Sequence, residues 1–219
     1  MGGSQAHEFM AFSEHGEDSL VICDACNTAS NRQVARVRKA TPAKEAPLPV
    51  EEVETPNAPT IEALAKQLGV GPERTAKAVF FVDRDGRLIV AIVRGDDDVE
   101  ETKLTNAIGA RDLRPAREEE IRAAGMVPGY ASPIGAKGAL VVVDDLVAAS
   151  ANLVVGANKE GFHLKNVNLP RDFTADHTVD LASAKAGDAC LSCGGALRLE
   201  KGIEVGNIFK LGTQIGRAH

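Results

Sequence analysis

Apolar residues follow helix and strand periods mainly between residues 57 and 182. Within 61–68, the apolar side chains are spaced as one face of an α-helix. Thr60 precedes this segment as a suitable N-cap, and Gly69 follows it as a suitable C-terminal stop. The pattern therefore predicts a short amphipathic helix over 61–68.

Two strongly apolar runs come next, at residues 78–82 and 88–93. The Asp-Arg-Asp-Gly sequence at 83–86 is typical of a tight turn, so the two runs predict a β-hairpin. Because successive positions in both runs are apolar, we expect both faces of this sheet to be covered.

The pattern up to residue 182 predicts further helices and strands. We expect helices at 99–108 and 116–124, a buried strand at 138–144, and a strand pair at 152–157 and 161–167 joined by a turn at 158–160. Together these elements fit one compact α+β domain at 57–182, with a mixed, largely antiparallel β-sheet covered by helices.

The flanking segments are less regular. One apolar run at 19–22 predicts a strand, and two short strands are expected at 196–200 and 204–211. Residues 38–56 combine several prolines with many Glu and Lys residues and follow neither period. We interpret them as a solvated linker or as an extended segment lying on a surface.

The composition limits the class of protein. With 44% hydrophobic residues the chain can build a core, but aromatics are 4% and Trp is absent, so aliphatic residues must fill it. No run approaches the roughly 18 uninterrupted apolar residues of a membrane span. The first eight residues lack the basic and apolar regions of a secretory signal, so we expect a cytoplasmic protein.

The net charge of −6 argues against broad electrostatic binding to nucleic acid, and we expect no DNA partner. Binding to RNA would need a local basic patch or a second binding domain. Arg74, Arg94, Lys159 and Lys165 are candidates for such a patch. Scattered surface charges are the alternative interpretation of the same residues.

All four cysteines lie outside the central domain, as two CxxC pairs: Cys23 with Cys26, and Cys190 with Cys193. Each pair can place two thiolates on one tetrahedral zinc ion, and a domain inserted between two halves of a zinc ribbon explains the long separation. Four reduced thiols, disulfides or a redox CxxC are the alternatives. A zinc ion with four thiolate ligands has no open position, so the site would be structural rather than catalytic.

Motifs in both parts of the chain resemble bacterial-type prolyl-tRNA synthetase. Those that look like its class II catalytic core are GGSQAHEF at 2–9, GED at 16–18, Asn31 and GIEVGNIFKLGT at 202–213. Those that look like its inserted editing domain are TAK at 75–77, VRGD at 93–96, GYASP at 129–133 and GAN at 156–158. The departures are Ala6, where the family usually has Ser, and 214–216, where it usually has Lys-Tyr-Ser.

The resemblance implies a synthetase core fragment with the first CxxC at 1–37, the linker at 38–56, an editing domain at 57–182, and returning core with the second CxxC at 183–219. The expected activity is deacylation of alanyl-tRNA(Pro), held by its acceptor end, with no membrane partner and no cofactor for the hydrolysis. The family's ATP-binding elements, last class II motif and anticodon-binding domain are missing from this sequence. We therefore expect neither ATP binding nor prolyl-adenylate formation.

Editing has a physical reason in the sizes of the two amino acids. A pocket built for proline cannot exclude the smaller alanine, because a missing methylene or two is worth only about 1–3 kcal/mol. A second site that admits alanine and rejects proline supplies the remaining discrimination. Two other functions stay open: a module that holds the acceptor end without turnover, and a synthetase remnant without ligase activity.

Ester hydrolysis needs a positioned water molecule and donors for the developing oxyanion. The resemblance makes Lys77 the expected catalytic residue, whose ammonium would meet the terminal tRNA phosphate or polarise the ester. By pattern alone, Lys77 is a surface lysine at the start of a strand.

The resemblance also implies a set of substrate-binding residues. Its members are Gly129, Tyr130, Ala131, Pro133, Asp144, Gly156, Asn158 and His163. The glycine and proline loops would supply backbone donors and pocket walls, His163 would select or position alanine, and Asp144 would orient water or Lys77. By pattern alone, the loops and Asp144 are typical of turns, and His163 is a packed or solvent-facing strand residue.

Overall fold

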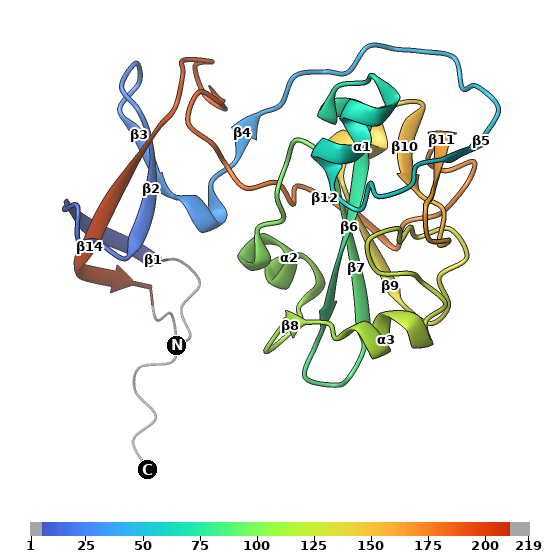
Figure 1. The fold of residues 1–219 in the computed structure, drawn as a ribbon. Coiled ribbons are helices and arrows are strands. Elements are labelled where there is room, and N and C mark those ends of the chain that lie inside the picture. The colour runs from blue at the N-terminus through green and yellow to red at the C-terminus, as the bar shows by residue number, and fades with distance from the viewer. Residues whose placement is uncertain (1–5, 211–219) are drawn as a thin grey trace. The chain divides into compact units, whose positions relative to one another are not determined.

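The computed structural model describes residues 6–210, which fold into two compact units (Figure 1). Unit 1 combines the described residues up to Arg38 with those from Ala184 onward, and unit 2 is Lys39–Ser183. Unit 2 therefore lies in the sequence between the two segments of unit 1. The function that we expect of each segment from its sequence stays a prediction for the corresponding unit.

Unit 2 is an α+β unit, as predicted. Its strands are β5 (Glu51–Glu54), β6 (Ala76–Val82), β7 (Leu88–Arg94), β8 (Arg114–Pro115), β9 (Leu140–Asp144), β10 (Leu153–Gly156), β11 (Phe162–Val167) and β12 (His177–Val179). Its helices are α1 (Ile61–Leu68), the 3-10 helix η2 (Pro72–Arg74), α2 (Glu101–Ile108), α3 (Glu118–Ala123) and α4 (Asp145–Ala149).

The strands of unit 2 form two sheets. The five-stranded sheet has the order β12-β9-β7-β6-β8, and it is mixed because β12, β9 and β7 are parallel while β6 and β8 are antiparallel to their neighbours. The three-stranded sheet has the order β10-β11-β5 and is antiparallel. The β6–β7 hairpin and the β10–β11 pair confirm the predicted strand pairs.

The central strand β7 is buried on both faces, as its apolar run predicted. Val90 and Ile92 belong to a core with residues of α3, α4, β10 and β11. Ile89, Ala91 and Val93 belong to a second core with Leu104 of α2. Helix α2 therefore covers one face of the sheet, and the small sheet with α3 and α4 covers the other (Figure 1).

Helix α1 begins and ends where its capping residues predicted. The Thr60 hydroxyl accepts a hydrogen bond from the Ala63 amide at 3.3 Å, and Gly69 takes the left-handed conformation with φ of 65°. Leu64 packs with Val154 of β10 in a small apolar cluster. The helix is therefore held against the three-stranded sheet.

Of the two interpretations of residues 38–56, the structure has the extended segment. It contains β5, which pairs with β11 along the edge of the small sheet. This segment has no apolar strand period, because Glu51, Glu52 and Glu54 are exposed and only Val53 is half-buried. Edge strands with charged side chains are common, since charge discourages pairing with other chains.

A cluster of charges ties the start of unit 2 to its later strands. The Lys39 ammonium lies 2.8 Å from Asp144, 2.5 Å from Asp145 and 2.7 Å from Asp180. Lys103 completes the cluster, 2.9 Å from Asp180. Burial alone would lower the pKa of Lys39, but hydrogen bonds to the three carboxylates outweigh it and raise that pKa.

Unit 1 is built mainly from antiparallel strands. They are β1 (Ala6–Phe12), β2 (Asp18–Cys23), β3 (Thr28–Asn31), β4 (Val37–Arg38), β13 (Ala189–Cys190) and β14 (Arg198–Phe209), with the 3-10 helix η1 (Arg32–Val34). One sheet has the order β1-β14-β2-β3, and β13 pairs with β4. Strand β2 confirms the strand predicted at 19–22.

Two short strands were expected at 196–200 and 204–211. Within the described residues the structure has one continuous strand instead, β14, so the predicted break between them was wrong. Gly202 misled the sequence interpretation because glycine usually breaks strands. Here it allows close packing: a Cβ on Gly202 would lie 2.8 Å from Leu20, and one on Gly16 would lie 2.2 Å from the Gly202 carbonyl oxygen. Residues 2–5 and 211–216 of the family motifs and departures lie outside the described residues.

Among the helices of residues 6–210, none has the length and apolar character needed to cross a lipid bilayer.

The charge cluster predicts a specific stability effect. Replacing Lys39 with Met leaves the fully buried Asp144 carboxylate without its cation, and we expect the free energy of unfolding to fall by about 3 kcal/mol. Chemical denaturation of the chain measures this loss. The control is Lys44→Met, an exposed lysine of the same segment; equal stability of the two variants would contradict the role of Lys39.

Candidate functional site

A pocket of about 320 Å³ opens in unit 2 beside the start of α1. Its walls come from the segment before α1, from β6, from the loop after α3, and from β10 and β11. The lining residues are Pro59, Thr60, Ile61, Glu62, Leu64, Ala76, Lys77, Ala78, Phe80, Gly129, Ala131, Gly156 and His163. Five of the residues singled out in the sequence therefore meet here: Lys77, Gly129, Ala131, Gly156 and His163.

Lys77 is the only lysine or arginine among these lining residues. It lies in β6 opposite Val93 of β7, so the hairpin fixes its backbone. Its ammonium lies 2.7 Å from the carboxylate of Asp98, and 29% of its side chain is exposed. The pocket thus has one cation, reachable from solvent and paired with an exposed acid.

His163 forms the buried end of the site. It is 4% exposed, and its Nδ1 lies 2.6 Å from the hydroxyl of the fully buried Thr55. The ring also lies against Tyr130, with 5.4 Å between ring centroids. Burial lowers the pKa of His163 to about 4, so the imidazole is neutral at pH 7.

The loop after α3 is held by β10 and the turn that follows it. The Asn158 side chain accepts a hydrogen bond from the Ser132 amide at 2.9 Å and donates to the carbonyls of Ser132 at 3.1 Å and Ile134 at 2.8 Å. The backbone amide of Asn158 donates to the Tyr130 carbonyl at 2.9 Å. Asn158 is therefore positioned to shape the loop and does not itself line the pocket.

Gly156 allows the same loop to approach β10. A Cβ at this position would lie 2.1 Å from the Tyr130 carbonyl oxygen and 2.5 Å from that of Ala131. At the other end, Gly129 has a φ of 82°, and a Cβ there would lie 3.2 Å from Pro59. Glycine at both positions is thus required by the shape of the pocket wall.

Besides Asn158, three of the expected substrate-binding residues do not line the pocket. Tyr130 and Pro133 are buried behind its wall. Asp144 is a correction to the sequence interpretation, because its carboxylate binds Lys39 and the amides of α4 and of residues 181–182 instead of meeting Lys77. The carboxylate is fully buried, caps α4 and balances the charge of Lys39, and it does not line the pocket.

Sequence reasoning missed several lining residues. Phe80 was counted only as a strand residue, and Thr60 only as a helix cap. Thr60, Ile61 and Glu62 belong to the start of α1, whose first amides have no partners within the helix and favour anions. The threonine cap was the one signal in the sequence that a helix terminus would open here.

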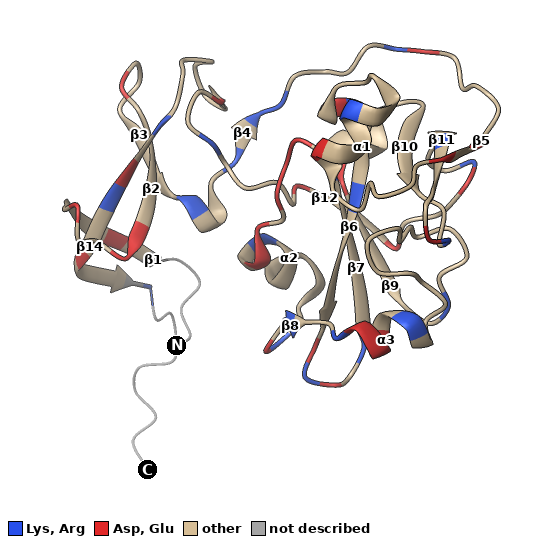
Figure 2. Ribbon diagram, viewed as in Figure 1, with Lys and Arg blue, Asp and Glu red and all other residues tan. Residues whose placement is uncertain are grey.

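The four candidate RNA-binding residues are paired with acids. Arg74 lies 2.6 Å from Glu45, Arg94 2.5 Å from Asp96, Lys159 2.9 Å from Glu52 and Lys165 3.7 Å from Glu51. Figure 2 shows the same mixing of blue and red along the described part of unit 2. These residues therefore do not form a purely positive patch.

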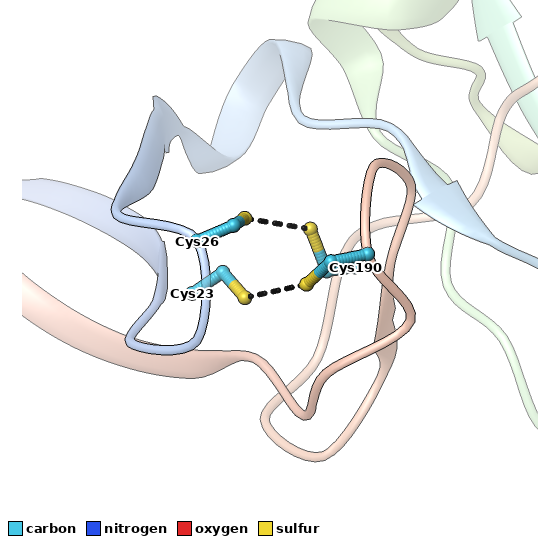
Figure 3. Close-up of side chains that lie close together, drawn as sticks. Cys23, Cys26 and Cys190 are labelled. Atoms are coloured by element: carbon cyan, nitrogen blue, oxygen red, sulfur yellow. Dashed lines mark hydrogen bonds between the residues drawn. The ribbon is translucent and has the colours of Figure 1, made fainter.

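Among residues 6–210, two side-chain groups have the composition of metal sites. In unit 1 the four cysteine sulfurs lie within 4.8 Å of one another (Figure 3). In unit 2 the oxygens of Asp144, Asp145 and Asp180 do so as well. The ammonium of Lys39 already binds these three acids, so only the cysteines have ligand atoms suited to a metal.

The residues that line the pocket lie within the region that matches a known family. The family model of the aminoacyl-tRNA editing domain matches residues 55–173. The proline–tRNA ligase of Salinispora tropica is 52% identical over 226 residues, covering 100% of this chain and 38% of the relative. That of Dehalococcoides mccartyi is 49% identical over 213 residues, covering 97% of this chain and 37% of the relative. The chain thus spans little more than a third of these relatives.

A solved structure shares the fold of unit 2. The crystal structure of a protein proposed as a trans-editing enzyme for prolyl tRNA synthetase matches with a TM-score of 0.53 and 19% identity. The match covers 62% of this chain and 87% of that chain.

Burial of His163 predicts a pH dependence of stability. The folded pKa of about 4 lies below the usual value of 6.5, so this contribution is complete above pH 6.5 and is lost as the pH falls toward 4. Between pH 7 and pH 5 we expect the chain to lose roughly 2 kcal/mol more unfolding free energy than His163→Gln. Denaturant titrations at both values measure this difference, and parallel losses in both proteins would contradict it.

Proposed function

Because the chain belongs to the aminoacyl-tRNA editing domain family, in the form found in prolyl-tRNA synthetases, we propose that it hydrolyses the ester of alanyl-tRNA(Pro). The observation that carries this proposal is the pocket in which Lys77, His163 and the backbone of the 129–131 loop meet. It combines a cation, a neutral buried imidazole and small residues around one space.

In the proposed binding mode, the small residues of the pocket select alanine. Gly156 and Ala131 leave room for a methyl group, and the loop cannot yield because its carbonyls already touch Gly156. A pyrrolidine ring would have to move the loop and break the hydrogen bonds of Asn158. Rejection of proline therefore follows from the stiffness of the wall, which supports selection by size.

Lys77 has the electrostatic role in this proposal. A tRNA acceptor end brings phosphate charges next to the terminal ribose, and an ammonium at the rim of the pocket attracts them. The start of α1 adds a weak positive field from its first amides, which the carboxylate of Glu62 in the pocket lining opposes. The Asp98 carboxylate, which is 75% exposed, can turn into solvent when the phosphate takes its place.

Hydrolysis itself joins a water oxygen to the ester carbonyl carbon and breaks the bond from that carbon to the ribose oxygen. The water gives up one proton to the aqueous surroundings, and the ribose oxygen takes one up, so the products are alanine and free tRNA. The backbone amides of Gly129 and Ala131 are the donors for the oxyanion, since that of Tyr130 already donates to the Val127 carbonyl, and the neutral imidazole of His163 positions the alanyl group. The zinc predicted from the cysteines takes no part in this reaction, because four thiolates leave it no open position.

A second candidate is a module that holds the acceptor end without turnover. The pairing of Lys77 with Asp98 and of the four other basic residues with acids favours it, because each pair weakens the local positive field. Turnover distinguishes the two candidates.

The deciding experiment compares alanyl-tRNA(Pro) and prolyl-tRNA(Pro) as substrates, with the chain at concentrations well below that of the tRNA. We expect multiple turnovers with alanyl-tRNA and at least roughly tenfold slower release of proline, the discrimination that one or two methylenes provide. Binding of alanyl-tRNA without turnover would leave the second candidate, and equal rates would overturn selection by size.

Removal of the pocket's cation tests the role of Lys77. We expect Lys77→Ala to lower kcat/KM for alanyl-tRNA at least roughly tenfold, the scale of one electrostatic contact in a transition state. Circular dichroism checks that the fold is kept.

Two matched variants accompany it. Asp98→Asn breaks the same ion pair but keeps the lysine, and Lys165→Ala removes a lysine outside the pocket; we expect both to stay within about threefold of the parent chain. If Asp98→Asn loses as much activity as Lys77→Ala, the ion pair is structural and Lys77 has no direct role.

A further inference from the structure

Unit 1 holds four cysteines that the proposed hydrolysis does not use. Cys23 and Cys26 come from the end of β2 and the turn after it, and Cys190 and Cys193 come from β13 and the turn after it. We propose that these four thiolates bind one structural zinc ion, which joins the two chain segments of unit 1 and is required for that unit to fold.

The spacing of the sulfurs fits a metal. Cys23 Sγ lies 3.4 Å from Cys193 Sγ, and Cys26 Sγ lies 3.7 Å from Cys190 Sγ. A tetrahedral ion with bonds of about 2.3 Å holds its sulfurs about 3.8 Å apart, whereas a disulfide requires about 2.05 Å. Figure 3 shows the labelled cysteines pointing toward one another from two facing loops.

The backbone around the second pair has the form of a metal-binding knuckle. Gly194 has a φ of 79°, and a Cβ on Gly195 would lie 3.4 Å from the sulfurs of both Cys23 and Cys193. The Gly195 amide donates to Cys193 Sγ at 3.4 Å, and the Cys190 amide donates to the Gly195 carbonyl at 2.8 Å. An amide directed at a sulfur helps to hold that ligand atom in one position, as a metal site needs.

Apart from the pairing of β14 with β1 and β2, unit 1 has few apolar contacts to hold its two segments together. Leu20 and Ile22 of β2 are buried, and the buried cluster around the cysteines is formed by Val21, Cys23, Ala35, Ala184, Cys190 and Leu197. Two of these six are proposed ligands, and two are alanines that bury little area. Small units with so few large apolar side chains usually rely on metals or cross-links, and here each cysteine pair comes from a different segment. A metal would therefore replace core contacts that the unit lacks.

Metal analysis of the purified chain tests the site directly. We expect one zinc per chain, and after exchange with Co²⁺ we expect the visible absorption bands of tetrahedral cobalt together with sulfur-to-cobalt charge transfer. Zinc added back should remove the cobalt bands. A chain that binds neither ion with its four thiols reduced would overturn the proposal, as would cobalt bands without charge transfer from sulfur.

The proposed structural role has its own readout. When a chelator removes zinc from the full chain, we expect amide exchange in β2 and β14 to accelerate at least roughly tenfold, while β6 and β7 keep their protection. Cys190→Ser should show the same pattern without chelator, and Ser192→Ala, in the same turn, should behave like the parent. Unchanged exchange in β2 and β14 after complete zinc loss would overturn the role in folding. None of these measurements depends on deacylation, so failure of either proposal is seen separately.

Discussion

The shape of the pocket depends on one close approach, between the backbone of Gly156 in β10 and the carbonyls of Tyr130 and Ala131. No residue with a side chain fits there, since a Cβ would lie 2.1 Å from the Tyr130 oxygen. Asn158 then fixes the loop with bonds to Ser132 and Ile134. Backbone groups and the side-chain amide of Asn158 make these contacts. The pocket wall is therefore more rigid than a wall formed by packed side chains alone.

This rigidity gives the site its chemistry. The buried face of the loop places Tyr130 against His163, and burial keeps that imidazole neutral. The open face leaves Lys77 in contact with solvent on the neighbouring strand β6. A small acyl group and a phosphate could therefore bind at opposite ends of one pocket, which is the arrangement that an aminoacyl ester at a tRNA end requires.

The sequence predicted those helices and strands that depend on residues close to one another in the chain. The helix between Thr60 and Gly69 and the hairpin of β6 and β7 follow from capping residues and apolar periods, and the structure has both. Strand β5 could not be found in this way, because its charged edge residues have no apolar period. Long strand β14 was divided at Gly202, since a packing role for a glycine depends on distant partners such as Gly16.

The same limit applies to the site. The family resemblance predicted five site residues that line one pocket: Lys77, Gly129, Ala131, Gly156 and His163. It also predicted a site role for Asp144. The partner of Asp144 is Lys39, which is 105 residues away and could not be inferred from the local pattern. The CxxC pairs are the opposite case: their spacing predicted that Cys23 and Cys190 would meet although a whole unit separates them in sequence.

In the proposed function, this pocket binds the alanyl end of the tRNA. The most direct measurement is a crystal structure of the chain with an adenosine that carries alanine through a non-hydrolysable amide at its 3′ position. We expect the alanine methyl group to lie beside Gly156 and Ala131, with the adenosine toward Lys77, and we expect no binding of the prolyl analogue at the same concentration. An alanyl group bound elsewhere, or a prolyl group seated in the same place, would contradict it.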